Sequence, residues 1–249
     1  MLRRVVPAVL LALLLAGNAV AAEKTYIVAT NPNWPPMEFL TPEKEFTGYE
    51  VELVNAIAEE MGFKVEWKNV QWDGLFAGLD TGRFDVVAGA VTITDERRQA
   101  MEFSDPFYQC KQAVILHKDD DAESTADLKG KTLGAQVSTT GHFAIQNMEG
   151  VADKSFDSLP LAVEAAYSGR IDGVVCDEPT AASFVLMNET YAGKLKIAFI
   201  IEDAKVEEYG IVFKKGNTEL RDIFNEGLKR VREKGIEAEL MKKWFGEAR

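Results

Sequence analysis

Cysteine and histidine are the scarcest chemically useful residues in this sequence, with two of each in 249 residues. Two cysteines are too few for a small fold framed by disulfides or for a cluster of thiolate ligands around a metal. No pair of histidines stands at metal-ligand spacing. The sequence therefore predicts no metal site and no cofactor.

Positive charge is also in short supply. Lys and Arg together number 28 against 40 Asp and Glu, which gives a formal net charge of −12 at pH 7. Without a basic field the chain does not attract nucleic acid or anionic lipid, which argues against DNA or RNA binding. The hydrophobic content of 47% suits a globular protein with a sizeable core rather than a disordered chain.

Long hydrophobic runs are absent except at the N-terminus. Arg3 and Arg4 precede an apolar run over 5–16, and the small residues Ala19, Ala21 and Ala22 follow. A membrane-spanning helix needs about 20 apolar residues, so this run is too short for an anchor. The order of the three regions predicts a cleaved secretory signal peptide over residues 1–22 and a periplasmic mature protein.

The remaining chain alternates between short apolar strands and amphipathic helices, which is typical of an α/β fold with two similar halves. Asp73 is expected to cap a helix that runs through Leu79. Strands are predicted at 26–30, 63–70, 85–90, 113–117, 131–136, 171–176 and 209–213, and helices at 51–61, 140–148, 161–167, 218–234 and 240–245.

Five short motifs go further than periodicity. They are GYEVEL (48–53), VTITDERR (91–98) with FSDPFY (103–108), DLKGKTLG (127–134), STTG (138–141) and YGI (209–211). In this order they strongly resemble the polar amino-acid family of periplasmic solute-binding proteins, the bacterial extracellular solute-binding proteins of family 3. The resemblance extends from residue 25 to the C-terminus.

The resemblance implies the two-lobe periplasmic-binding-protein fold of type II, in which two crossing strands join two α/β lobes and the ligand lies between them. The crossings would fall near 107–111 and 204–209. Lobe 1 would comprise residues 23–108 and 208–249, and lobe 2 residues 109–207. The implied function is capture of a polar amino acid by hinge closure and delivery to the permease subunits of an ABC importer, by a protein that is itself a monomer.

Arg97 is the residue that the resemblance assigns to the ligand carboxylate, because a guanidinium grips two oxygens in parallel. The alternative is a surface arginine paired with Asp95 or Glu96. Thr139 and Thr140 precede a predicted helix, whose first N–H groups favour a carboxylate; an ordinary helix cap is the alternative for these two.

Asp177 is assigned to the ligand ammonium, although an aspartate before Glu178 and Pro179 also suits a helix cap. The other lobe would add the backbone at Gly89 and Ala90 and the hydroxyl of Thr92. Trp34 and Trp72 match the aromatic residues that sandwich the ligand side chain in this family, and core packing is the alternative for both.

Selection of the ligand side chain is where this sequence departs from glutamine-binding relatives. Those relatives carry Asp, Lys and His where this chain has Asn31, Gln136 and Cys176. The loss of these charged groups favours a polar amino acid with a neutral side chain. Glu38 or Glu178 would still reach the pocket, so a basic ligand stays open.

The two cysteines, Cys110 and Cys176, are either a disulfide or two buried thiols, and the sequence does not decide between them. His142 is expected at the rim of the cleft or in a helix cap.

Two rival functions share this fold. A periplasmic cyclohexadienyl dehydratase is similar and would need a general acid in the cleft, for which Glu178 and Glu38 are the candidates. A ligand-sensing module is the third alternative; it is normally fused to a membrane segment and a signalling domain.

Overall fold

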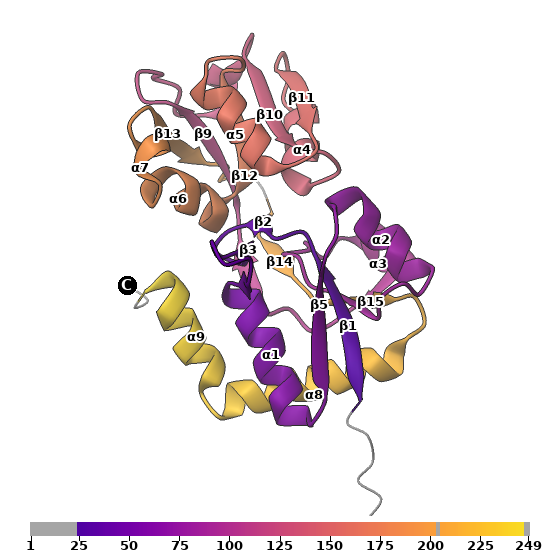
Figure 1. Ribbon diagram of the computed structural model, residues 1–249. Helices are drawn as coiled ribbons and strands as arrows, with labels where there is room; N and C mark the ends of the chain where they lie inside the picture. Colours follow the sequence, from indigo (N-terminus) through magenta and orange to yellow (C-terminus); the bar gives the residue numbers. More distant parts are fainter. Residues whose placement is uncertain (1–23, 203–204, 247–249) are drawn as a thin grey trace, which may run out of the picture.

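The computed structural model describes residues 24–202 and 205–246, which form two α/β lobes, one above the other in Figure 1. The α/β character predicted from the alternating pattern is confirmed. The predicted signal peptide, residues 1–22, lies outside the described residues. No helix among the described residues is long and apolar enough to cross a membrane.

The first lobe combines the early and the late parts of the described chain. Its sheet has the order β5-β1-β6-β15-β7, and β15 runs antiparallel to both of its neighbours. The strands are β1 (Thr25–Thr30), β5 (Lys64–Asn69), β6 (Val86–Val87), β7 (Met101–Phe103) and β15 (Val212–Lys214); the helices are α1 (Tyr49–Met61), α2 (Trp72–Asp80), α3 (Asp95–Ala100), α8 (Thr218–Glu233) and α9 (Ile236–Phe245). Helices α1 and α8 pack on one face, and α2 packs on the other.

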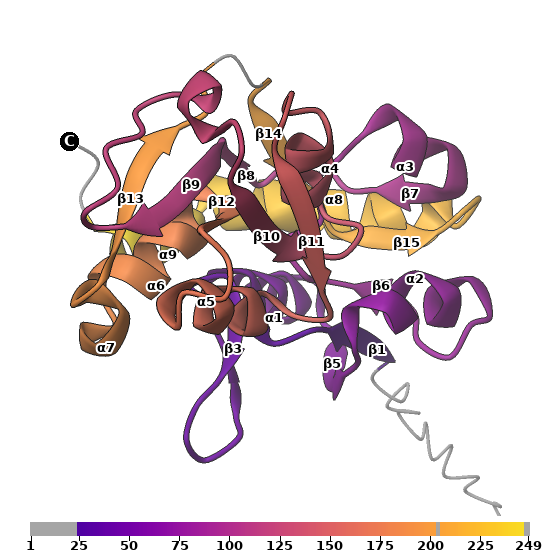
Figure 2. The same ribbon diagram turned by 90° about the horizontal axis from the view of Figure 1, so that it is seen from above.

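The second lobe is a single continuous stretch of chain. Its sheet has the order β11-β10-β12-β9-β13. The strands are β9 (Gln112–His117), β10 (Thr132–Gln136), β11 (Ala152–Phe156), β12 (Gly173–Asp177) and β13 (Leu195–Ile200); the helices are the 3₁₀ turn η1 (Thr125–Leu128), α4 (Thr140–Gln146), α5 (Leu159–Tyr167), α6 (Glu178–Leu186) and α7 (Glu189–Ala192). Figure 2 shows α4 above this sheet and α5 and α6 below it, in agreement with two separate apolar clusters.

Two strands cross between the lobes, β8 (Tyr108–Cys110) and β14 (Glu207–Tyr209), and they pair with each other antiparallel. Both strands fall at the predicted crossings. Residues 203 and 204, at the start of the second crossing, lie outside the described residues. The prediction of one strand over 209–213 is wrong. Tyr209 pairs with Tyr108 in the crossing, whereas Val212 pairs inside the first sheet, so the chain changes sheets at Gly210.

A small antiparallel sheet of β2 (Asn33–Trp34), β3 (Glu38–Leu40) and β4 (Phe46–Thr47) leads into α1. Gly48 precedes that helix with φ +127°, and a Cβ there would lie 2.2 Å from the carbonyl oxygen of Met37. Only glycine fits both constraints. At the other end Gly62 closes α1 in the left-handed conformation.

The predicted capping role of Asp73 is wrong. Helix α2 starts at Trp72, with Gln71 as the residue that caps it, and Asp73 lies in the first turn. Trp72 is buried in the same apolar cluster as Leu75. Packing of its indole therefore favours a helix that already includes Trp72 and begins before Asp73. The carboxylate of Asp73 still favours this end of the helix electrostatically.

Aromatic rings fill the core between the first sheet and α8. Phe224 lies 5.1 Å from Phe213 and 5.3 Å from Phe63 between ring centroids, and Tyr26 packs edge-on against Phe63. The face of α8 that carries Phe224 is the apolar face that its spacing predicts.

The substitution Phe224→Ala is expected to lower the free energy of unfolding by about 3–5 kcal/mol, because it leaves a cavity in this aromatic core. Lys229→Ala, on the exposed face of the same helix, should change it by no more than about 0.5 kcal/mol. Urea unfolding followed by circular dichroism measures both. Equal effects of the two substitutions would contradict this packing.

Candidate functional site

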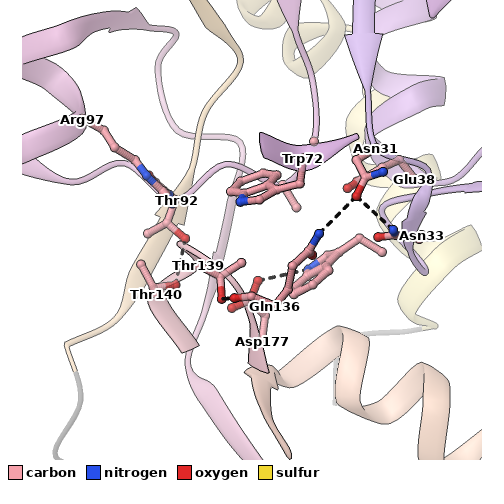
Figure 3. Close-up of a pocket in the computed structure, with 13 residues that line it drawn as sticks. Asn31, Asn33, Glu38, Trp72, Thr92, Arg97, Gln136, Thr139, Thr140 and Asp177 are labelled. Carbon is pink, nitrogen blue, oxygen red and sulfur yellow. Dashed lines mark hydrogen bonds between the residues drawn. The ribbon is translucent and has the colours of Figure 1, made fainter. Parts of the chain in front are cut away.

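A cavity lies between the lobes (Figure 3), and the space in it that atoms do not fill, including the part open to solvent, is about 330 Å³. Every residue predicted to bind ligand lines it, together with Asn33 and Glu38. The lining residues are Asn31, Asn33, Trp34, Glu38, Trp72, Gly89, Ala90, Thr92, Arg97, Gln136, Thr139, Thr140 and Asp177. Their common location agrees with the predicted site, whereas their contacts with a ligand stay predictions.

Arg97 extends from α3 of the first lobe toward the second. Thr94 caps α3 by accepting a hydrogen bond from the backbone N–H of Arg97 at 3.1 Å, which fixes the first turn of this helix. The guanidinium donates to the carbonyl of Thr92 at 2.8 Å and to that of Ser138 at 3.1 Å, and it lies 5.7 Å from the Trp72 ring. Among the described residues Arg97 makes no ion pair with Asp95 or Glu96. The structure therefore does not support the alternative of a surface arginine paired with one of them.

Thr139 caps the N-terminus of α4, whereas Thr140 is the first residue of the helix itself. Its hydroxyl accepts the N–H of His142 at 3.2 Å and donates to the carbonyl of Gln136 at 2.8 Å. The following N–H groups, at Thr140 and Gly141, have no acceptor within the helix because they belong to its first turn. Gly141 allows this turn to approach the sheet, since a Cβ there would lie 2.8 Å from the carbonyl of Val175.

Asp177 is buried at the end of β12, where donors from three parts of the structure reach its carboxylate. Trp34 donates through Nε1 at 3.1 Å, Tyr209 through its hydroxyl at 2.6 Å, and Gln112 through its side-chain amide. Asp177 precedes α6, but its side chain makes no capping hydrogen bond. Burial and the negative charge of Glu207 raise its pKa to about 6 despite the three donors.

Amide groups occupy the part of the cavity assigned to the ligand side chain. Asn31 Oδ1 accepts from Asn33 Nδ2 at 2.9 Å and, across the cleft, from Gln136 Nε2 at 3.2 Å. Gln136 also donates to the carbonyl of Asp157 at 3.1 Å. Cys176, the third position where glutamine-binding relatives differ, is buried and is not among the lining residues.

Glu38 and Glu50 form a pair of buried, interacting carboxyl groups, and one oxygen of each, Glu38 Oε2 and Glu50 Oε1, has no hydrogen-bond partner among the described residues. Such a pair requires a proton. Burial raises the pKa of Glu38 and raises that of Glu50 to about 8, so the pair keeps at least one proton at neutral pH. Glu50 Oε2 also accepts the N–H of Ala90 at 2.6 Å. Ala90 has φ +49°, a conformation that needs such support in a residue other than glycine.

The remaining candidates lie away from the cavity. Glu178 is exposed, so of the two proposed general acids only Glu38 reaches the cleft. Cys110 and Cys176 are buried free thiols, and burial raises the pKa of each. His142 lies 3.1 Å from Asp153 and accepts the N–H of Ser138 through Nδ1, beside the cavity.

Comparison with known proteins gives consistent matches over nearly the whole chain. The sequence model of the bacterial extracellular solute-binding proteins, family 3, matches residues 26–247. A probable histidine-binding protein of Neisseria gonorrhoeae is 33% identical over 237 residues, 93% of this chain and 87% of the relative.

Two solved structures are similarly close. An ancestral arginine-binding protein bound to glutamine is 34% identical with a TM-score of 0.84, and the match covers 91% of this chain and 100% of that one. An ancestral amino acid-binding protein that is a precursor of cyclohexadienyl dehydratase is 31% identical with a TM-score of 0.80, over 89% of this chain and 95% of that one.

Two lobes, two crossing strands and a polar cavity between the lobes define a two-lobe solute-binding protein. The chain belongs to the bacterial extracellular solute-binding proteins, family 3. The predicted resemblance and the type II fold are confirmed. The predicted main function, amino-acid binding, is confirmed as well, since these relatives are amino-acid-binding proteins.

Arg97→Ala is expected to weaken amino-acid binding by about 2–5 kcal/mol, because it removes a charged, hydrogen-bonded partner of the ligand. Arg98→Ala is the matched control, since Arg98 is exposed and lies over the Phe103 ring. Isothermal titration calorimetry measures both. Unchanged affinity in Arg97→Ala would contradict the site.

Acid is expected to weaken binding. Below about pH 6 the folded protein carries a proton on Asp177, and a bound ammonium must displace it. With a ligand that does not itself titrate in this range, the Kd at pH 5 should be about tenfold that at pH 7.5. The stability of the ligand-free protein has the opposite sign: the contribution of Asp177 is lost as the pH rises through about 6.

Asp177→Asn provides the control for this pH dependence. The amide keeps the shape of the side chain but does not titrate, so its weaker residual binding should vary little between pH 5 and 7.5. Titration calorimetry at several pH values compares the two proteins, and a pH-independent Kd in the unmodified protein would exclude Asp177 as the ammonium partner.

Proposed function

We propose that this protein captures a polar amino acid with a neutral side chain between its lobes and delivers it to the permease subunits of an ABC importer. The single observation that carries the proposal is the composition of the cavity. Arg97 and the buried carboxylate of Asp177 line the same cavity as the amides of Asn31 and Gln136, and these two amides hydrogen-bond to each other.

The charged groups match an amino-acid backbone. In this assignment Arg97 and the first N–H groups of α4 take the ligand carboxylate. Asp177, the hydroxyl of Thr92 and the carbonyl at Gly89 take the ammonium. Trp34 and Trp72 enclose the aliphatic part of the ligand, as aromatic rings of mixed character do in such sites.

The side-chain end favours a ligand that exchanges hydrogen bonds rather than charge. Asn31 and Gln136 offer both donors and acceptors. The Glu38–Glu50 pair holds at least one proton, so Glu38 can face the ligand as a neutral carboxylic acid. Glutamine, which the ancestral arginine-binding relative holds, has this chemistry.

A cationic side chain is the second candidate, and Glu38 is the observation that favours it. Release of a proton from the Glu38–Glu50 pair would leave a carboxylate in the cavity, and a buried carboxylate gains from a nearby cation. That the same ancestral relative is an arginine-binding protein supports this candidate.

Closure follows from the contacts between the lobes. Trp34 reaches Asp177, Gln136 reaches Asn31 and Arg97 reaches Ser138, so a ligand that touches both lobes stabilises the closed arrangement. In this proposal the protein is a monomer, is secreted to the periplasm with a cleaved signal peptide and is not an enzyme. The lobe boundaries are proposed as 23–108 with 208–249 and 109–207.

The first test is a ligand screen on protein that has been unfolded, dialysed and refolded. A ligand at 100 times its Kd adds about 2.7 kcal/mol, which raises the Tm of a chain of this size by roughly 5–11 °C. We expect a rise with glutamine or another neutral polar amino acid. Turnover of prephenate without any response to amino acids would favour the dehydratase alternative.

Proton release then separates the two ligand classes. Titrations at pH 7 in buffers of different ionisation enthalpy count the protons released on binding. A neutral ligand should release only the small fraction held by Asp177, whereas a cation should also release a proton of the Glu38–Glu50 pair. Glu38→Gln should retain a neutral ligand and lose a cationic one; the reverse result would overturn the assignment.

A further inference from the structure

Glu207 lies behind the cavity on the crossing strand β14, and it is not one of the lining residues. Its Oε2 accepts the hydroxyl of Thr92 at 2.8 Å and that of Thr140 at 2.7 Å. Its Oε1 accepts from Gln112 Nε2 at 3.1 Å. One carboxylate thereby joins the loop after β6 in the first lobe to the start of α4 and to β9 in the second.

The number of hydrogens and lone pairs on the two threonine hydroxyls determines which ligand group they can bind. A threonine hydroxyl has one hydrogen and two lone pairs, and a carboxylate only accepts. When Thr92 and Thr140 both donate to Glu207, each hydroxyl can only accept from other groups. Thr140 Oγ1 accepts from Gln112 Nε2 at 3.2 Å, which leaves it one lone pair for a group in the cavity. Their oxygens are 3.4 Å apart, so a single donor group with several hydrogens can reach both.

Charge acts in the same direction as the hydrogen bonds. The groups that face Glu207 are Asp177, Arg97 and Cys110, and the negative charge of Glu207 raises the pKa of each. Burial lowers the pKa of Arg97 at the same time. Thr92, Thr140 and Asp177 therefore offer only hydrogen-bond acceptors in a region of negative potential. This region repels the carboxylate of a ligand.

We propose that Glu207 is a specificity-determining positioning residue: by holding both threonine hydroxyls as acceptors, it makes binding depend on the ligand's ammonium group. The ligand carboxylate is then left to Arg97 and the backbone N–H groups of α4, and Thr140 contributes its hydroxyl to the ammonium. This inference rests on the proposed function, in that the ligand is taken to be an amino acid.

The test is Glu207→Gln with Glu208→Gln as its matched control. Glu208 is the next residue of the same strand, and its carboxylate accepts instead from Gln109 Nε2 at 2.9 Å. Both substitutions remove one negative charge from β14. Only at position 207 does the new amide donate to a threonine oxygen, which frees that hydroxyl to donate into the cavity.

The measurement is the ratio of two Kd values, for the amino acid found in the screen and for its analogue with a hydroxyl in place of the ammonium. Glu207→Gln should lower this discrimination by about tenfold, because the hydroxyl analogue then finds a donor. It should also move the weakening of amino-acid binding in acid to lower pH, since Asp177 loses a negative neighbour. Glu208→Gln should leave both quantities unchanged.

An unchanged discrimination ratio in Glu207→Gln, or an equal change in Glu208→Gln, would overturn the proposal. Thr92→Val serves if Glu207→Gln does not fold. It should weaken binding of the amino acid much more than binding of the hydroxyl analogue, and equal weakening of the two would count against the proposal. Failure of the unmodified protein to bind any amino acid would instead contradict the proposed function.

Discussion

The buried carboxylate of Asp177 is the constraint around which the rest of the cleft is arranged. Removing a charge from water costs several kcal/mol unless hydrogen bonds replace its hydration. Here the donors come from three separate parts of the chain: Trp34 in the first lobe, Gln112 in the second and Tyr209 on a crossing strand. The charge is fully hydrogen-bonded only when the lobes are together, so the relative position of the lobes and the state of this carboxylate depend on each other.

The cleft contains more negative groups than positive ones. Among the described residues that line the cavity Arg97 is the one cation, and carboxyl groups at Glu38, Glu50, Asp177 and Glu207 lie in or behind its walls. Such an excess of negative groups is tolerated because Glu38 and Glu50 hold at least one proton between them and Glu207 receives three hydrogen bonds. In the proposed assignment the ammonium group of an amino acid offsets this excess of negative charge, and its carboxylate pairs with Arg97.

The sequence alone predicts the strands that are short apolar runs and the site residues that belong to motifs. Strand β9 carries the continuous apolar run Ala-Val-Ile-Leu at 113–116, and the motifs of the family resemblance point to the residues that line the cavity. Strand β11 reads Ala-Asp-Lys-Ser-Phe, is mostly exposed and pairs only with β10, so it has no apolar pattern to find. Sequence alone leaves Glu38 as one option and does not point to Glu207, because each acquires its role from a residue that the fold brings close. For Glu38 this residue is Glu50, and for Glu207 it is Thr140.

The position of β15 fixes the order in which the two lobes can be completed. This strand lies between β6 and β7 in the first sheet, although more than a hundred residues separate β7 from it along the chain. The second lobe is one uninterrupted segment and can fold as soon as it has been made. The first sheet lacks the strand between β6 and β7 until the last quarter of the chain has been made, so the half-finished polypeptide has no complete cleft in which to hold a ligand.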